Sequence, residues 1–302
     1  KSNHANVNLK ANSGSVNTQN VTADQAVAIE AAKDITAKGD VTSTNANVDL
    51  KANGGSIKTS GQVNAQKDVD YNAKGSIITE DIINSTAGNI HLQTKADEGD
   101  IGNITFGGNV TAEHGNINID VLQNGSVTDN DNTFTARGDK GDIKSGNFAL
   151  NIIGKGNVDL HEIYATNNAT INVANGNIIT DGDVTAETGK AALNSSAGSV
   201  TTKKVTAGQA VDIYAKQDIK ADGDLKSNHA NVDLLAGGSI TTNGTVTAHD
   251  DVIANANGNI ITDGDVTAET GKAVLNSSAG SVTMQNVTAN NKVDIDAVQN
   301  IT

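Results

Sequence analysis

The sequence predicts an all-β, single-stranded parallel β-helix, in which short strands wind around one axis and successive coils stack. Apolar and polar residues alternate in short runs such as Val287-Thr288-Ala289, and a period of two is that of a β-strand. Gly, Asn and Asp separate these runs and favour turns between them. The pattern returns about every 20 residues. One unit has too few apolar side chains to bury itself, so the copies must stack.

The composition supports stacked strands. The 302 residues include no Pro, whereas average usage would give about 15. Pro is excluded from central strands because it has no N–H group for the ladder. The chain has three Phe, three Tyr and no Trp. We therefore expect a thin core of Val, Ile, Leu and Ala.

Charge and cysteine content argue against several classes of function. The formal net charge is −14, with 35 acidic against 21 basic residues, which disfavours binding to nucleic acid or anionic lipid. The absence of Cys excludes disulfides, thiolate nucleophiles and zinc–thiolate sites. No apolar run approaches 18 residues, so no membrane span is expected. The sequence begins at Lys1 in the middle of the pattern and without Met, which indicates a fragment of a longer polypeptide.

Residues 1–302 are expected to form one continuous β-helix of about 15 coils, each of roughly 19–22 residues. Residues 1–94 predict regular coils, with Val16, Ile35, Ile57 and Ile77 at equivalent places. Residues 171–302 predict regular, nearly duplicated coils. The segment NGNIITDGDVTAETGKAALNSSAGSV at Asn175 recurs 82 residues later with one substitution, which corresponds to four coils.

Residues 95–170 predict irregular coils with outward loops. The repeating units lengthen there, and the segment contains the only Arg of the chain and all three Phe (Phe106, Phe134 and Phe148). Extra residues in a stacked array must leave it as loops, and loops often carry binding sites. The alternative is that the repeat has drifted and the Phe side chains fill an enlarged core.

The alternation also predicts which side chains face outward. In each Val-Thr-Ala run Val and Ala face the core, and Thr faces solvent at residues Thr22, Thr42, Thr111, Thr185, Thr206, Thr247, Thr267 and Thr288. The acids of the Val-Asp-Ile/Leu runs face outward in the same way at Asp49, Asp159, Asp212, Asp233 and Asp294. Like charges stacked about 4.8 Å apart repel, so Asn or Thr is expected at many such places. Corner Asn residues are expected to adopt left-handed backbone and to hydrogen-bond along the stack.

Three Asp-Gly-Asp segments are the strongest candidates for chemistry: Asp181–Asp183, Asp222–Asp224 and Asp263–Asp265. Paired carboxylates serve polysaccharide-cleaving β-helix enzymes. However, Asp-Gly is also ordinary turn chemistry, and a catalytic site would not recur in each duplicated copy. We therefore predict no enzymatic activity. Asp181, Asp183, Asp263 and Asp265 are weak candidates for loosely bound Ca²⁺ through oxygen ligands, although the calcium-roll nonapeptide pattern is absent. No other cofactor is expected.

Arg137-Gly138-Asp139 is a candidate recognition tripeptide within the irregular segment. A cation and a carboxylate held apart on a Gly turn can bridge an integrin-type receptor, although a chain rich in Gly and Asp also produces this tripeptide by chance. The six His residues are scattered without metal-binding spacing and are expected on the surface. The Thr file suggests ice or crystal binding only weakly, because the paired Thr-x-Thr columns are missing. The Asn-x-Ser/Thr sequons are composition effects or glycosylation sites.

The repeat resembles a known family. GSVTTKKVTAGQAVDIYA at Gly198–Ala215 and GSVTMQNVTANNKVDIDA at Gly280–Ala297 are similar to filamentous-haemagglutinin-type repeats. These repeats occur in large Gram-negative exoproteins of two-partner secretion systems and in contact-dependent-inhibition stalks. The resemblance covers nearly the whole chain and implies a right-handed β-helical rod. It also implies export through an outer-membrane transporter and display on the cell surface. The family's secretion domain and any toxin are absent from this sequence.

The expected function is a non-enzymatic, extracellular stalk of a bacterial surface adhesin. It would mediate attachment, biofilm formation or cell–cell contact through repeated weak contacts with a receptor or glycan on another cell. The alternative is a self-assembling subunit of an extracellular filament, joined end to end. A carbohydrate-active β-helix enzyme is a third possibility.

Overall fold

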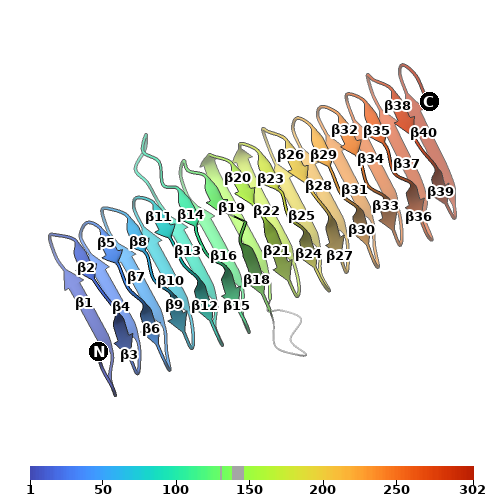
Figure 1. The fold of residues 1–302 in the computed structure, drawn as a ribbon. Helices are drawn as coiled ribbons and strands as arrows, with labels where there is room; N and C mark the ends of the chain where they lie inside the picture. Colours follow the sequence, from blue (N-terminus) through green and yellow to red (C-terminus); the bar gives the residue numbers. More distant parts are fainter. Residues whose placement is uncertain (130, 138–145) are drawn as a thin grey trace. The chain divides into compact units, whose positions relative to one another are not determined.

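The structure is a computed structural model that describes residues 1–129, 131–137 and 146–302. The chain is an all-β parallel β-solenoid of about 13 turns with three parallel sheets, and the described residues contain no helix. This confirms the predicted fold class. The chain divides into two compact units, Lys1–His161 and Glu162–Thr302. Each coil contributes one strand to each sheet, so strands that stack are about one coil apart in sequence (Figure 1).

The first unit contains β1 to β20. Its sheet I consists, in order, of β1 (Val7–Ala11), β4 (Val27–Ala31), β7 (Val48–Ala52), β10 (Val69–Ala73), β13 (Ile90–Thr94), β16 (Ile117–Val121) and β19 (Phe148–Lys155). Its sheet II consists of β2 (Val16–Thr18), β5 (Ile35–Ala37), β8 (Ile57–Thr59), β11 (Ile77–Thr79), β14 (Ile104–Phe106), β17 (Val127–Asp129) and β20 (Val158–Leu160). Its sheet III consists of β3 (Val21–Ala23), β6 (Val41–Ser43), β9 (Val63–Ala65), β12 (Ile83–Ser85), β15 (Val110–Ala112) and β18 (Thr133–Ala136).

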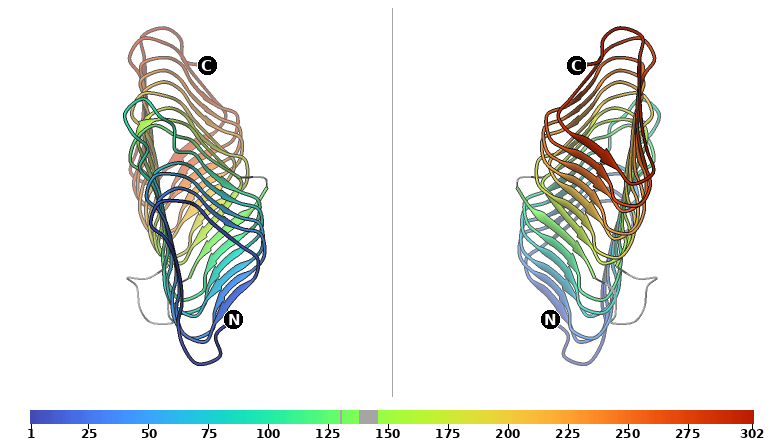
Figure 2. Two further views of the ribbon diagram at one scale, coloured as in Figure 1. Left: turned by 90° about the vertical axis from the view of Figure 1, so that its left-hand side faces the viewer. Right: turned by 90° about the vertical axis from the view of Figure 1, so that its right-hand side faces the viewer.

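The second unit contains β21 to β40. Its sheet I consists of β22 (Ala169–Asn175), β25 (Ala191–Ser195), β28 (Val211–Ala215), β31 (Val232–Ala236), β34 (Val252–Ala256), β37 (Lys272–Ser277) and β40 (Lys292–Ala297). Its sheet II consists of β23 (Ile178–Thr180), β26 (Val200–Thr202), β29 (Ile219–Ala221), β32 (Ile240–Thr242), β35 (Ile260–Thr262) and β38 (Val282–Met284). Its sheet III consists of β21 (Glu162–Ala165), β24 (Val184–Ala186), β27 (Val205–Ala207), β30 (Leu225–Ser227), β33 (Val246–Ala248), β36 (Val266–Ala268) and β39 (Val287–Ala289). The views of Figure 2 let the reader follow successive coils around the sheets of each unit.

The predicted count of about 15 coils is too high because coils in the irregular segment are longer than 22 residues. Val7 pairs with Val27 and Val27 with Val48, at the expected spacing. In contrast, Ile90 pairs with Ile117, and Ile117 pairs with Phe148. The extra residues of these longer coils lie in the connections between strands, while the strands keep their register. Fewer turns therefore use the same number of residues.

The inward and outward assignments are confirmed. Val184 and Ala186 of β24 are fully buried, whereas Thr185 between them is partly exposed. Thr185 lies directly beside Thr206, and Thr22 lies beside Thr42, so outward Thr residues do form files. Sheet II adds a feature that the sequence analysis did not predict, because its strands often place Thr on the buried side, as at Thr180 and Thr202. The hydroxyl of Thr180 donates to that of Thr202 at 2.7 Å.

The avoidance of stacked acids is incomplete. Asp49 lies directly beside Asp70, and Asp212 lies beside Asp233. Burial, followed by the repulsion of Asp70, raises the pKa of Asp49. Burial and the nearby Asp212 likewise raise the pKa of Asp233. Asp212 is compensated by an ion pair with Lys190.

The three Phe residues fill the core of the first unit. Phe106, Phe134 and Phe148 come from β14, β18 and β19, one from each sheet, and all three are fully buried. The ring centroids of Phe106 and Phe134 are 5.0 Å apart, and those of Phe134 and Phe148 are 5.6 Å apart, in edge-to-face geometry. This outcome matches the core-filling interpretation of these residues.

Corner side chains hydrogen-bond along the stack, as predicted. Asn103 Oδ1 accepts from the Ser126 N–H at 2.8 Å, and Ser126 Oγ accepts from the Asn157 N–H at 3.0 Å. The left-handed backbone expected at corner Asn residues is wrong. Among the described non-glycine residues, Asp131 is the one with positive φ, at 57°. The Asn residues at these corners act through their side-chain oxygens, which accept backbone N–H groups of the next coil.

Candidate functional site

The best-formed surface site lies on the outward face of sheet I in the first unit, where β10, β13 and β16 run side by side. Outward positions of neighbouring strands coincide because the register is kept, so Asp70 lies beside His91 and His91 lies beside Asn118. Two positions further along β16, Asp120 also faces outward, beside Gln93. These side chains come from residues 21 to 29 apart in the sequence, and stacking brings them together.

A ladder of corner residues forms one wall of this site. Asp68 Oδ1 accepts from the backbone N–H of Asn89 at 2.8 Å and from its side-chain amide at 3.4 Å. Asn89 Oδ1 accepts from the backbone N–H of Asn116 at 2.9 Å and from its side-chain amide at 3.1 Å. Asn116 Oδ1 holds Asn147 in the same way, at 2.8 and 3.0 Å. Each amide is therefore fixed at both ends.

Gly precedes Asn at three of these corners, as Gly88-Asn89, Gly115-Asn116 and Gly146-Asn147. A Cβ on Gly115 would overlap the carbonyl oxygen of Gly88, so the close approach of successive corners requires the missing side chain. Gly-Asn immediately before an alternating apolar run is thus the sequence signal of the ladder. The sequence analysis did not select it.

His91 lies between two carboxylates from the neighbouring coils. Its Nε2 is 3.4 Å from Asp120 Oδ2, and its Nδ1 is 3.6 Å from Asp70 Oδ1. Interaction with Asp120, and then with Asp70, raises the pKa of His91 to about 9. The same contact with His91 lowers the pKa of Asp120, which also accepts a hydrogen bond from Asn151 at 2.9 Å. His91 is therefore a cation at neutral pH and links three coils.

Together these side chains line a groove of about 470 Å³, which we call the amide–carboxylate groove. Its lining residues are Asp68, Asp70, Asn89, His91, Asn116, Asn118 and Asp120. Every one of them carries hydrogen-bonding groups, and none is aromatic. The site can therefore bind polar groups, whereas the aromatic residues Phe106, Phe134 and Phe148 are committed to the core.

Replacing His91 with Gln is expected to remove a pH-dependent part of the stability of the first unit. The folded-state pKa of about 9 lies above the ordinary 6.5, so the stabilisation is fully present below pH 6.5 and is lost as pH rises through about 9. The ring is 37% exposed, and solvent screening limits the effect to about 1 kcal/mol. Urea unfolding at pH 6 and pH 10 measures it, with H4Q as the control. An NMR titration that places the His91 pKa at or below 6.5 would contradict this account.

The structure leaves the predicted recognition tripeptide incomplete. Arg137 follows β18, is exposed, and donates its backbone N–H to the carbonyl of Ala112 at 2.9 Å. Gly138 and Asp139 lie outside the described residues. The integrin-type interpretation therefore stays a prediction.

The calcium candidates are exposed turn residues of the second unit. Asp181 and Asp183 flank the turn between β23 and β24, and Asp263 and Asp265 flank the turn between β35 and β36. Asp265 Oδ1 accepts from the amide of Asn286 at 2.9 Å, a residue of the next coil. Calcium binding by these four acids stays a prediction.

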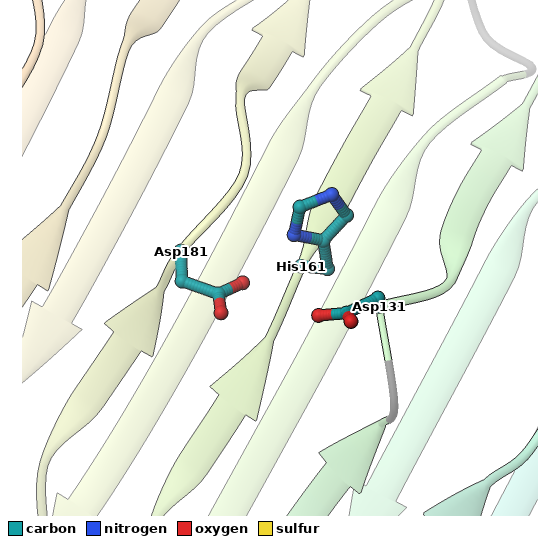
Figure 3. A group of neighbouring side chains, drawn as sticks. All are labelled: Asp131, His161 and Asp181. Carbon is teal, nitrogen blue, oxygen red and sulfur yellow. The ribbon is translucent and has the colours of Figure 1, made fainter.

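Figure 3 labels Asp181 together with Asp131 and His161. Asp181 belongs to the second unit and follows β23, while Asp131 and His161 belong to the first unit and follow β17 and β20. All three thus hold equivalent places, just after the sheet II strand of their coils. The backbone N–H of His161 is held by the carboxylate of Asp129, at 3.2 and 3.1 Å. The sequence analysis selected only Asp181 of these residues.

The third Asp-Gly-Asp segment shows how such turns are neutralised. Asp222 is 2.8 Å from the ammonium of Lys220 and accepts from the amide of Asn243 at 2.8 Å. The hydrogen bond from Lys220 is the main cause of a lowered pKa at Asp222. Turns of neighbouring coils therefore supply Lys or amide partners to the acids, which is consistent with their interpretation as structural turns.

Comparison with known proteins adds no relative. The chain matches no protein-family model, no curated protein and no solved structure. No helix of the described residues is long and apolar enough to cross a membrane. What is established is therefore a class of fold, the parallel β-solenoid, and its functional assignment rests on the chain's own chemistry.

Proposed function

We propose that the chain is a non-enzymatic, extracellular stalk region of a bacterial surface adhesin, of the filamentous-haemagglutinin-type repeat class. Its role is attachment, biofilm formation or cell–cell contact through many weak contacts. An outer-membrane transporter exports it, and a receptor or glycan on another cell is its partner. The resemblance of Gly198–Ala215 and Gly280–Ala297 to such repeats supports this assignment.

The observation that carries the proposal is the repetition of outward polar side chains in register. Thr247, Thr267 and Thr288 form one file on sheet III of the second unit. The duplicated segments at Asn175 and Asn257 present the same surface again four coils further along, since Ile178 and Ile260 lie in one file of sheet II. Equal sites at fixed intervals favour avidity, in which single contacts are weak and their sum is strong.

The test is attachment as a function of surface density. Beads coated with the whole 302-residue chain at graded density are applied to epithelial cells and to bacterial layers, and the retained beads are counted. Retention is expected to rise more steeply than in proportion to density, because each bead must form several contacts at once. Beads coated with the urea-unfolded chain are the control. No retention at any density, or release of reducing sugar from polysaccharides by the folded chain, would contradict the proposal.

A further inference from the structure

The amide–carboxylate groove has the properties of a built polar site rather than of an acidic patch. Its three carboxylates are all engaged: Asp68 with Asn89, Asp70 with His91, and Asp120 with both His91 and Asn151. An incoming metal ion or ammonium group would have to displace these partners. Each carboxylate nevertheless keeps acceptor capacity, because an ionised carboxylate has about four lone-pair positions.

Asn118 supplies the donor that this groove still has to offer. Its side chain lies beside His91 on the outward face of β16, and its other file neighbour is Ala149, which has no polar side-chain atom. Within the described residues the Asn118 amide makes no side-chain hydrogen bond, although its neighbours Asn89 and Asn116 are both fixed in the ladder. The groove therefore combines acceptors on Asp68, Asp70 and Asp120 with a donor and an acceptor on Asn118.

Charge and chemistry then select the ligand. Three carboxylates against one imidazolium leave the groove negative, which repels anionic ligands. Hydroxyl groups both donate and accept, and so match carboxylates beside an amide without removing the existing pairs. Since the ladder already orders Asn89 and Asn116, little side-chain entropy is lost on binding. A volume of about 470 Å³ lies within the usual range for small ligands.

We propose that the amide–carboxylate groove binds the hydroxyl groups of an uncharged sugar, with Asn118 as its principal donor. This inference rests on the proposed adhesive function and names the ligand class of one site on the first unit. With neither an aromatic platform nor a deep cavity, a single groove binds weakly, and adhesion depends on many copies of the chain at a surface.

The experiment is a ¹H–¹⁵N NMR titration of the whole chain with methyl glycosides of glucose, galactose, mannose and N-acetylglucosamine at millimolar concentration. Parallel titrations use N-acetylneuraminic acid, glucosamine and calcium chloride. At least one neutral glycoside is expected to shift the Asn118 side-chain amide and the backbone signals of β10, β13 and β16. N118A is expected to weaken that binding about tenfold, the loss of one or two hydrogen bonds.

The matched control is N8A. Asn8 occupies the same strand position on β1, is exposed, and lies beside Ala28, so its removal tests the substitution without the groove. Neutral sugars that cause no shift, or shifts caused only by the anionic sugar, glucosamine or calcium, would overturn the inference. So would equal affinity of N118A and the unchanged chain. Bead attachment without sugar binding overturns only this inference, whereas sugar binding without bead attachment overturns only the adhesive role.

Discussion

Replacing Phe134 with Ala is expected to lower the free energy of unfolding of the first unit by about 3–5 kcal/mol, the range for fully buried aromatic residues. Phe134 is completely buried and touches Phe106 and Phe148 edge to face. Its removal leaves a cavity and also ends both ring–ring contacts, each of which contributes about 0.5–1.5 kcal/mol beyond area burial. The neighbouring rings come from two other strands and cannot collapse into the space without breaking register.

Urea unfolding followed by circular dichroism measures this loss, and amide hydrogen exchange locates it. Because each coil contacts mainly its neighbours, exchange is expected to rise most in β15, β18 and β19 and little in β1 and β2. F134L keeps most of the volume and should cost less than half as much. A loss below about 1 kcal/mol for F134A would show that the aromatic cluster does not hold the enlarged coils together.

The core could be predicted from the sequence because its signal is local. Val184, Thr185 and Ala186 are consecutive residues, and the period of two fixes their facing without any knowledge of the partner strand. The stacking direction follows from the same pattern once it repeats. The number of turns does not follow, since it depends on how many residues leave the stack between Ile90 and Phe148.

The candidate site could not be predicted because it depends on register across coils of unequal length. His91 meets Asp70 from the coil before and Asp120 from the coil after, and the two steps differ in length. Nothing near His91 in the sequence marks it as different from the other His residues. A signal was present one step earlier: Gly88-Asn89 and Gly115-Asn116 precede the strands that line the groove, and a corner Asn repeated in consecutive coils indicates a ladder.

Replacing Ile213 with Asp is expected to destabilise the second unit by about 3–5 kcal/mol, while Tyr214→Asp one residue later should change stability by less than about 1 kcal/mol. Ile213 is 2% exposed and lies between Leu193 and Leu234, so a carboxylate there would be buried without a partner. Tyr214 lies on the outward face of the same strand, between Asn194 and Leu235. An acid at Tyr214 stays in contact with water.

The comparison of I213D with Y214D tests the pleat on which every outward assignment depends, including those of the groove residues. Both variants introduce the same charge into β28 and leave the ladder N–H groups in place, so composition, charge and strand propensity are matched. Thermal and urea unfolding of the two variants provide the measurement. If Y214D were as damaging as I213D, the two faces of β28 would not differ in burial. A one-residue shift of register, which exchanges the faces, would then have to replace the present assignment.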